Sequence, residues 1–288
     1  MCCVVAIISQ LNRSPNVVYK IYQARTAGLV VTNAYNLENA PRKSAVEIPL
    51  LTMSSIKLDQ ISPAELGDLK KRVVDAAQGL FDNHLVISTF GVVSVRIPNT
   101  DYVLITPSGF SKSRVHPDNL IVVDFDGKLI NGKLRPSVET PMHTYIHRHR
   151  SDINTVIHTH SPMACGFAAA NMDIPCVSAE QAFYLGGRVP IVRKYSLPGT
   201  TKPVELGAIL KALEKIDAVL LRKHGVVVVG RTPEEGLDTA IVLEDVAKQA
   251  FYSMQLTKPK EFTKRELDYL RVFKKTKYGQ AGYLPQPS

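Results

Sequence analysis

The stretch Thr155-Val-Ile-His-Thr-His-Ser-Pro162 restricts the fold of this chain more than any other. Its first residues are apolar or β-branched, which is typical of a buried strand, and Ser161-Pro162 is typical of the start of a helix. Side chains alternate between the two faces of a strand, so His158 and His160 would project on the same side at the strand end. Two neighbouring imidazoles are half of a metal site, and the other ligands would come from elsewhere in the chain.

Runs rich in β-branched residues alternate with helical patterns along most of the chain. Strands are predicted over residues 84–91, 92–97, 102–106, 120–124, 128–130, 155–160, 188–192, 218–221 and 226–229, and helices over 62–82, 139–149, 161–171, 203–213 and 232–256. Capping boxes at Ser62-Pro63-Ala-Glu65 and Thr232-Pro233-Glu-Glu235 mark two of the helix starts. Strands in hairpins with interspersed helices predict an α/β domain whose mixed sheet is covered on both faces.

Periodicity and composition divide the chain into three parts. We expect residues 1–52 to be a poorly structured N-terminal extension, residues 53–256 to form the folded domain, and residues 257–288 to be a basic C-terminal tail. The chain has 288 residues, of which 45% are hydrophobic, and it can therefore bury a core without disulfides. The four cysteines show no C-x-x-C spacing and no secretory framework, which predicts reduced thiols in a cytoplasmic protein.

The net charge of +9 raises the possibility of a nucleic-acid partner, but its distribution argues against one. The excess is concentrated at the two ends, and the region between them carries 22 basic and 21 acidic side chains. No stacking aromatics are interleaved with the basic residues in a recognisable module. No apolar run approaches the roughly 18 residues that a membrane span needs. We therefore expect neither a nucleic-acid nor a membrane partner.

Candidates for the missing ligands come from two other segments. His224 lies in a Lys-His-Gly turn between two apolar strands, where a side chain can reach a neighbouring strand end. Glu139 begins the helix that precedes the His158 strand, and it is the leading candidate for an oxygen ligand or a base. His143 and His147 lie four residues apart on that helix and form a rival pair, although no glutamate completes an H-E-x-x-H motif. We interpret this pair as helix-surface residues or as supports of the site.

Seven segments, taken in order, resemble the class II aldolase and adducin head family, which includes zinc-dependent fuculose-phosphate aldolase and ribulose-phosphate 4-epimerase. They are Thr89-Phe-Gly-Val-Val-Ser-Val-Arg96, Ile105-Thr-Pro-Ser-Gly109, Arg135-Pro-Ser-Val-Glu-Thr-Pro-Met-His143, Val156-Ile-His-Thr-His-Ser161, Tyr184-Leu-Gly-Gly187, Pro198-Gly-Thr200 and Leu221-Arg-Lys-His-Gly225. The resemblance implies a three-layer α/β/α sandwich with a mixed, largely antiparallel sheet, and a homotetramer with interfacial active sites. It implies that His158, His160 and His224 bind Zn²⁺ or another divalent transition metal, and that Glu139 is a metal ligand or the catalytic base.

The function implied by this resemblance is metal-dependent cleavage of a C–C bond in a small ketose phosphate. Such a cleavage leaves negative charge on an enediolate, which a divalent cation stabilises as a Lewis acid. Epimerases, dehydratases and decarboxylases on this scaffold use the same metal and also stabilise an enediolate, so these activities remain alternatives. Glu180 is a second acid–base candidate. A non-catalytic, adducin-like oligomerisation module is a further alternative, although such a module needs no metal ligands.

The expected substrate phosphate site departs from the family pattern. The residues that match its elements are Gly91, Ser108, Gly109 and Ser137. Glycine lets backbone N–H groups approach an anion closely, and Ser137 lies near a helix start. Val92 stands where family aldolases carry Asn, however, and Val138 stands where they often carry a second Ser, so two polar partners are missing. Lys112 or Arg114 could compensate for this loss.

Overall fold

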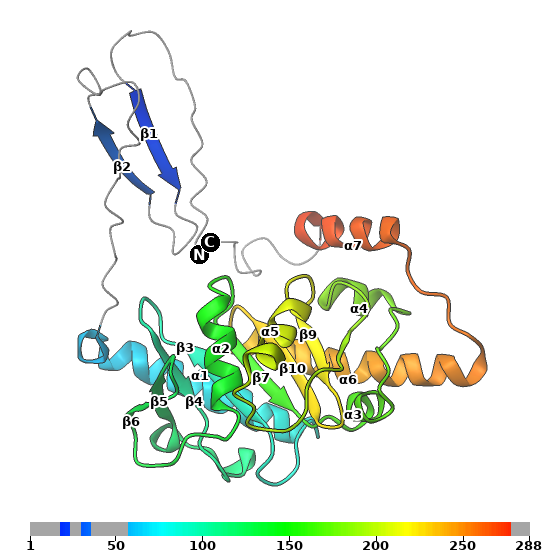
Figure 1. The fold of residues 1–288 in the computed structure, drawn as a ribbon, viewed down its shortest axis with the longest axis horizontal. Coiled ribbons are helices and arrows are strands. Elements are labelled where there is room, and N and C mark those ends of the chain that lie inside the picture. The colour runs from blue at the N-terminus through cyan, green and yellow to red at the C-terminus, as the bar shows by residue number, and fades with distance from the viewer. Residues whose placement is uncertain (1–17, 24–29, 36–56, 278–288) are drawn as a thin grey trace. The chain divides into compact units, whose positions relative to one another are not determined.

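The structure is a computed structural model that describes residues 18–23, 30–35 and 57–277 (Figure 1). The chain divides into two compact units, Met1–Ser54 with Pro285–Ser288, and Ser55–Leu284. In the first unit, β1 (Val18–Gln23) pairs antiparallel with β2 (Val30–Tyr35). This hairpin falls within the segment that the sequence predicts to be poorly structured, and the rest of that segment lies outside the described residues. The boundary at residue 52 stays a prediction.

The second unit is built on an eight-stranded sheet with the order β6-β5-β4-β3-β7-β10-β9-β8. Its strands are β3 (Val92–Arg96), β4 (Tyr102–Ile105), β5 (Ile121–Asp124), β6 (Leu129–Asn131), β7 (Thr155–Thr159), β8 (Ile191–Val192), β9 (Ala218–Leu221) and β10 (Gly225–Gly230). Only β8 and β9 pair in parallel, and the other neighbours are antiparallel. The predicted mixed, largely antiparallel sheet is therefore confirmed.

Helices cover both faces of this sheet (Figure 1). The α-helices of this unit are α1 (Pro63–Asp82), α2 (Thr140–His149), α3 (Pro162–Ala169), α4 (Ala179–Tyr184), α5 (Pro203–Ala212), α6 (Pro233–Leu256) and α7 (Lys264–Lys277), and α7 contacts α4 rather than the sheet. Helix α6 contacts both α1 and α3, and these three helices contact strands of the sheet, whereas α2 and α5 contact each other and lie against β7 and β8. This arrangement is the predicted three-layer α/β/α sandwich.

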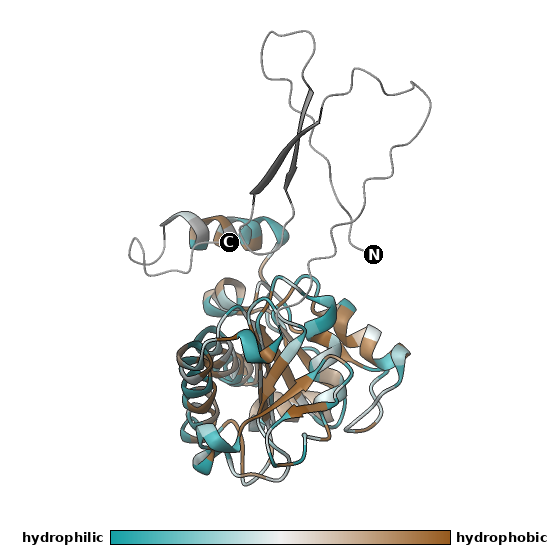
Figure 2. Ribbon diagram, turned by 90° about the vertical axis from the view of Figure 1, so that its left-hand side faces the viewer, coloured by the Kyte–Doolittle hydropathy of each residue, from teal (hydrophilic) through white to brown (hydrophobic). Residues whose placement is uncertain are grey.

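N-cap residues explain where two of the helices begin, and buried apolar side chains explain why the helices pack against the sheet. Ser62 and Thr232 accept hydrogen bonds from the backbone N–H groups of Glu65 (3.1 Å) and Glu235 (3.2 Å), as expected for N-caps. The four valines of Val226–Val229 are all buried, because β10 is a central strand with helices on both sides. Each fully buried valine contributes roughly 1.5–3 kcal/mol relative to exposure. Figure 2 accordingly shows predominantly apolar strands enclosed by helices with hydrophilic outer faces.

The predicted strand over residues 84–91 is wrong. The chain forms a loop there, in which His84 and Ser88 both have positive φ (57° and 52°), and two such residues interrupt an extended strand. Leu85 and Val86 are each only 2% exposed, so their apolar side chains belong to the core without belonging to the sheet. The carbonyl of Leu85 accepts the N–H of His160 (3.1 Å), and the loop therefore lies directly against the end of β7.

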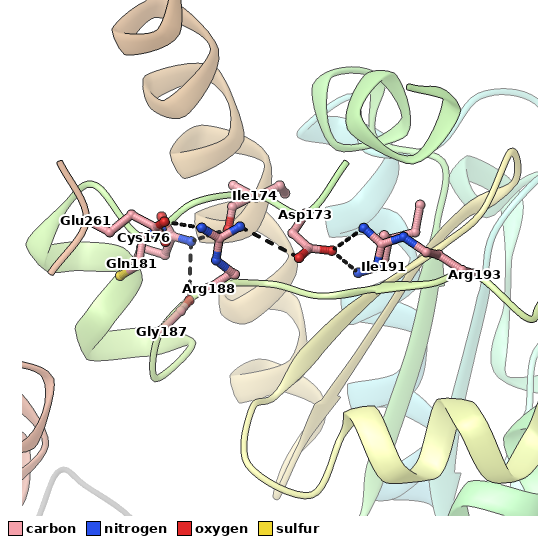
Figure 3. A network of polar contacts seen from close by, with 9 residues as sticks. All are labelled: Asp173, Ile174, Cys176, Gln181, Gly187, Arg188, Ile191, Arg193 and Glu261. Atoms are coloured by element: carbon pink, nitrogen blue, oxygen red, sulfur yellow. Dashed lines mark hydrogen bonds and ion pairs between the residues drawn. The ribbon is translucent and has the colours of Figure 1, made fainter. Parts of the chain in front are cut away.

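The α-helices α4 and α7 were not predicted, and a polar network lies beside α4 (Figure 3). Helix α4 follows Cys176, and α7 lies in the segment that the sequence treats as a basic tail. Glu261 accepts the N–H of Cys176 (3.1 Å) and pairs with Arg188, which also contacts Asp173 (3.6 Å). This network fastens the chain between α6 and α7 to the loop that leads into α4.

Among residues 57–277 and the short β1–β2 hairpin, no helix combines the length and the hydropathy that crossing a membrane requires.

Candidate metal centre

Three histidines meet at the edge of the sheet where β7 ends and β10 begins. His158 is in β7, His160 follows that strand, and His224 lies in the turn between β9 and β10. One ring nitrogen of each lies within 4.8 Å of the others, and Nε2 of His158 is 3.0 Å from Nε2 of His160. The antiparallel pairing of β7 with β10 brings this turn beside the strand end, although His224 follows His158 by 66 positions in the chain.

Hydrogen bonds to the outer ring nitrogens orient two of these imidazoles. Nδ1 of His158 lies 2.8 Å from the carbonyl oxygen of Val226, which can only accept, so this nitrogen carries the proton and Nε2 carries the lone pair. Nδ1 of His224 lies 2.8 Å from the hydroxyl of Tyr195. When Nδ1–H donates to the phenol oxygen, the Nε2 lone pair of His224 is likewise free to bind a metal.

The three imidazole rings pack so closely that the residue after His224 must be glycine. A Cβ atom on Gly225 would lie 2.5 Å from the carbonyl oxygen of Thr159 and 2.8 Å from Cε1 of His158. Both distances are shorter than van der Waals contact, so a larger residue would push β10 away from β7. The Lys-His-Gly sequence of this turn therefore combines a ligand with the space that the ligand cluster needs.

The electrostatic environment keeps all three imidazoles neutral. Burial lowers the pKa of His158 well below its usual value, with a further contribution from the neighbouring histidines, and it also lowers the pKa of His160. Burial lowers the pKa of His224 to about 4. Neutral imidazoles present the lone pairs that a transition metal needs. Tetrahedral Zn–N bonds of about 2.0–2.1 Å place ligand nitrogens roughly 3.3 Å apart, close to the observed His158–His160 separation. The donor set therefore fits Zn²⁺.

Glu139 places a carboxyl group beside this cluster. It is the N-cap residue of α2, is only 4% exposed, and its Oε1 lies 4.0 Å from Nε2 of His224. The N–H of Gly199 donates to the same oxygen (3.1 Å). Burial raises the pKa of Glu139 to about 7, and the Gly199 hydrogen bond opposes that shift. Because His224 is neutral, the contact is not an ion pair, and the carboxyl group is free to exchange a proton near neutral pH.

Tyr195 is a component of the site that the sequence analysis missed. Its side chain is fully buried, and its ring stacks on His224 with an interplanar angle of 3° and 5.4 Å between ring centroids. Burial and the nearby Glu139 raise its pKa, so the phenol keeps its proton. The available signal was weak, because a tyrosine in Arg193-Lys-Tyr-Ser196 carries no metal motif and only the fold brings it against the turn at His224.

We expect Tyr195→Phe to weaken zinc binding by about 10- to 100-fold, because ligand histidines depend on the hydrogen bond at their other ring nitrogen. Competition with a chromophoric chelator measures this affinity. Tyr145→Phe is the matched control, since that ring contacts His149 at the exposed end of α2. Equal zinc affinity in Tyr195→Phe and wild type would show that the phenol does not hold His224.

The structure joins the loops that carry the predicted phosphate-binding residues. The N–H of Ser108 donates to the carbonyl of Arg135 (3.0 Å), and Pro107 and Pro136 form an isolated β-bridge, so the loop with Gly109 lies against the loop with Ser137. A Cβ atom on Gly91 would lie 3.1 Å from the carbonyl oxygen of His158, which places the third loop against the metal cluster. Two of the three loops therefore lie side by side, and the loop with Gly91 packs against the backbone of β7 at His158.

The two valines that replace polar residues of the family pattern lie in different environments. Val92 packs in a small apolar cluster with Val103, Ile105, Ile121 and Val123, where it contributes to the core. Val138 is 64% exposed beside Glu139. Phe90, which is also exposed, stacks on His160 with 4.9 Å between ring centroids. Val138 and Phe90 therefore add apolar side chains to the surroundings of the metal cluster.

The remaining candidate residues lie outside the cluster. Glu180 is exposed in the first turn of α4, and none of its described contacts reaches the three histidines. His143 and His147 are fully buried, which contradicts the first of the two interpretations, helix-surface residues, and leaves the second, supports of the site. Their ring nitrogens lie 2.7 Å and 2.9 Å from Oγ of Ser94. Since Ser94 is in β3, the two histidines fix α2, and with it Glu139, against the sheet.

The fold and this constellation agree with a comparison against known families. The family described as Class II Aldolase and Adducin N-terminal domain matches residues 71–251. The chain belongs to this family. The matched range contains all three histidines, Glu139 and the three loops.

Two activities, epimerisation and aldol cleavage, are named among the proteins similar to this chain. The chain is 33% identical over 204 residues to a protein from Mycoplasma pneumoniae named probable L-ribulose-5-phosphate 4-epimerase UlaF, covering 66% of this chain and 84% of that protein. A solved L-fuculose 1-phosphate aldolase superposes with a TM-score of 0.68 at 25% identity, covering 72% of this chain and 96% of the other. The L-fuculose-1-phosphate aldolase from Thermus thermophilus is 29% identical, with a TM-score of 0.56 and coverage of 68% and 99%.

Proposed function

We propose that this protein is a zinc-dependent enzyme that breaks a C–C bond of a small ketose phosphate by a retro-aldol step. The observation that carries the proposal is the approach of three neutral imidazoles to within 4.8 Å, with the Glu139 carboxyl group 4.0 Å from one of them. His158, His160 and His224 would hold the cation. When bound, it would supply a Lewis acid for carbonyl and hydroxyl oxygens of the substrate.

The protein's own groups supply proton transfer and binding. Retro-aldol cleavage removes the proton of a hydroxyl group while the adjacent C–C bond breaks and its electron pair moves toward the carbonyl. Glu139 is the group that takes or returns the proton, because its carboxyl lies beside the cluster and its pKa of about 7 permits both directions. The loops at Gly91, Ser108-Gly109 and Ser137 would bind the phosphate through N–H and hydroxyl groups.

Two outcomes of the same bond cleavage are supported by different relatives. An epimerase would rejoin the two fragments with the opposite configuration, which the similarity to proteins named L-ribulose-5-phosphate 4-epimerase favours. An aldolase would release them, which the likeness to solved fuculose-phosphate aldolases favours. We place epimerisation first, because the curated relatives share the higher identity. The protein would be a cytoplasmic homotetramer with active sites at its subunit interfaces.

A substrate assay tests both outcomes. The full chain, loaded with zinc, is incubated separately with L-ribulose 5-phosphate and with L-fuculose 1-phosphate. Formation of D-xylulose 5-phosphate indicates epimerisation, and release of dihydroxyacetone phosphate indicates aldol cleavage. Either activity should disappear after chelation and return with zinc. Stoichiometric zinc without turnover of either compound would contradict the proposal, and a stable oligomer that binds no zinc would favour a non-catalytic, adducin-like role.

A further inference from the structure

Lys112 is a buried cation beside the loops that carry the glycines of the proposed phosphate site. It opens the short 3₁₀ helix Lys112–Arg114 and is 1% exposed. No acidic side chain among the described residues lies within ion-pair distance of its ammonium group. Lysines are almost never fully buried without a partner, because removing the charge from water costs several kcal/mol. A buried ammonium group without an acidic partner is therefore an unusual feature, and a bound anion would stabilise its charge.

The ammonium group joins two separate loops. Nζ donates to the carbonyl oxygen of Phe110 (2.9 Å) and to that of Thr89 (3.3 Å). Gly91 follows Thr89 by two residues, and Gly109 precedes Phe110, and both glycines have positive φ (82° and 64°). Lys112 therefore turns the negative ends of two peptide dipoles toward itself. Any anion held between the loops then avoids the repulsion of those two carbonyl oxygens.

The same loops contain backbone donors without partners. Among the hydrogen bonds formed within the described part of the chain, none uses the N–H of Gly91, Gly109 or Phe110. An anion is the ligand that satisfies several N–H groups at once, since it offers only acceptors. The ammonium group is hydrogen-bonded to a carbonyl oxygen of each loop, so it adds positive potential where these donors lie.

We propose that Lys112 is the positioning residue that makes this site prefer phosphorylated substrates: it holds the Thr89 and Phe110 carbonyls away from the anion and neutralises the phosphate charge. This inference rests on the proposed function, because it assigns the phosphate of that substrate to these loops. It explains how anion binding persists although Val92 and Val138 replace polar partners. Burial lowers the pKa of Lys112 to about 8, so the group still carries its charge at pH 7.

The test compares Lys112→Met with Arg114→Met in the zinc-loaded full chain. Both variants lose one positive charge and gain a methionine. Arg114 is the other compensating residue that the sequence suggests, but it is exposed two residues further along the same 3₁₀ helix, so the comparison decides between the two cations. The dissociation constant of inorganic phosphate is measured by calorimetry, together with zinc content and thermal unfolding. We expect Lys112→Met to weaken phosphate binding about tenfold or more, with zinc unchanged, and Arg114→Met to stay within about twofold of wild type.

Kinetics separate positioning of the phosphate from general damage. With a sugar phosphate that wild type converts, Lys112→Met should raise KM about tenfold and leave kcat within about threefold. Lys112→Gln, which keeps an N–H donor but no charge, replaces Lys112→Met if the latter does not fold. Should neither fold, hydrogen exchange of wild type must show inorganic phosphate protecting amides in both loops. Unchanged phosphate affinity in a folded, zinc-bound variant, or no such protection, would overturn the inference.

Inorganic phosphate also separates this inference from the proposed function. If wild type binds phosphate through Lys112 but converts neither sugar phosphate, the proposed reaction fails and the assignment of Lys112 stands. If wild type converts a sugar phosphate and Lys112→Met binds phosphate equally well, the proposed reaction stands and the assignment of Lys112 fails.

Discussion

Replacing His158 by alanine is expected to abolish stoichiometric zinc binding and to reduce turnover by about three orders of magnitude or more. His158 is the ligand whose orientation is most strongly constrained, because its strand and the hydrogen bond to the Val226 carbonyl both fix the ring. Removing it leaves two imidazoles, which do not hold a catalytic zinc ion on their own. Metal analysis by mass spectrometry and an assay at saturating substrate measure the two losses.

His149→Ala is the control for this experiment. His149 lies at the exposed end of α2 and hydrogen-bonds only the backbone of its own helix among the described residues. It should keep full zinc content and activity. Because His158 is itself buried, circular dichroism of both variants must show that the fold is retained. A folded His158→Ala protein with one zinc ion per chain would exclude the three-histidine site.

Changing Glu139 to glutamine is expected to lower kcat by about 100- to 10,000-fold, the range typical of losing a general acid–base group. Glutamine keeps the size of the side chain and can still accept the Gly199 N–H through its amide oxygen. It cannot exchange a proton, however, so binding should survive while chemistry stops. The measurement is kcat and KM at saturating zinc, with zinc content determined on the same preparation.

Glu180→Gln provides the matched comparison, because Glu180 was the rival acid–base candidate and is exposed on α4. It should remain within about twofold of wild type. A large loss of kcat for Glu180→Gln combined with a small one for Glu139→Gln would reverse the two roles. Loss of zinc from Glu139→Gln would instead identify Glu139 as a metal ligand.

The histidine cluster could be anticipated from sequence because strand geometry is local. Period-two alternation alone places His158 and His160 on one side, and apolar runs on either side of His224 already predict the hairpin that presents it. The actual convergence depends on β10 pairing with β7, a long-range contact that no short segment encodes. The resemblance to a family supplied that information, whereas periodicity did not.

The errors have a common physical origin in tertiary context. Residues 84–91 have the composition of a strand, but positive φ values at His84 and Ser88 and packing against the end of β7 make them a buried loop. Tyr195 and the Ser94 contacts of His143 and His147 were beyond reach for the same reason. Each of these contacts depends on which face of one element packs against which face of another. The intrinsic conformational preferences of the residues do not specify that packing.

Hairpin turns are usually the places where a protein tolerates additional residues, because they lie at the surface and pack against little. The turn between β9 and β10 is an exception, since it holds His224 at bonding distance from Tyr195 and packs Gly225 against the backbone of Thr159. One inserted residue would displace the imidazole and shift the register of a central strand. Variation in loop length, and any engineered fusion or permutation, must therefore be directed away from this turn.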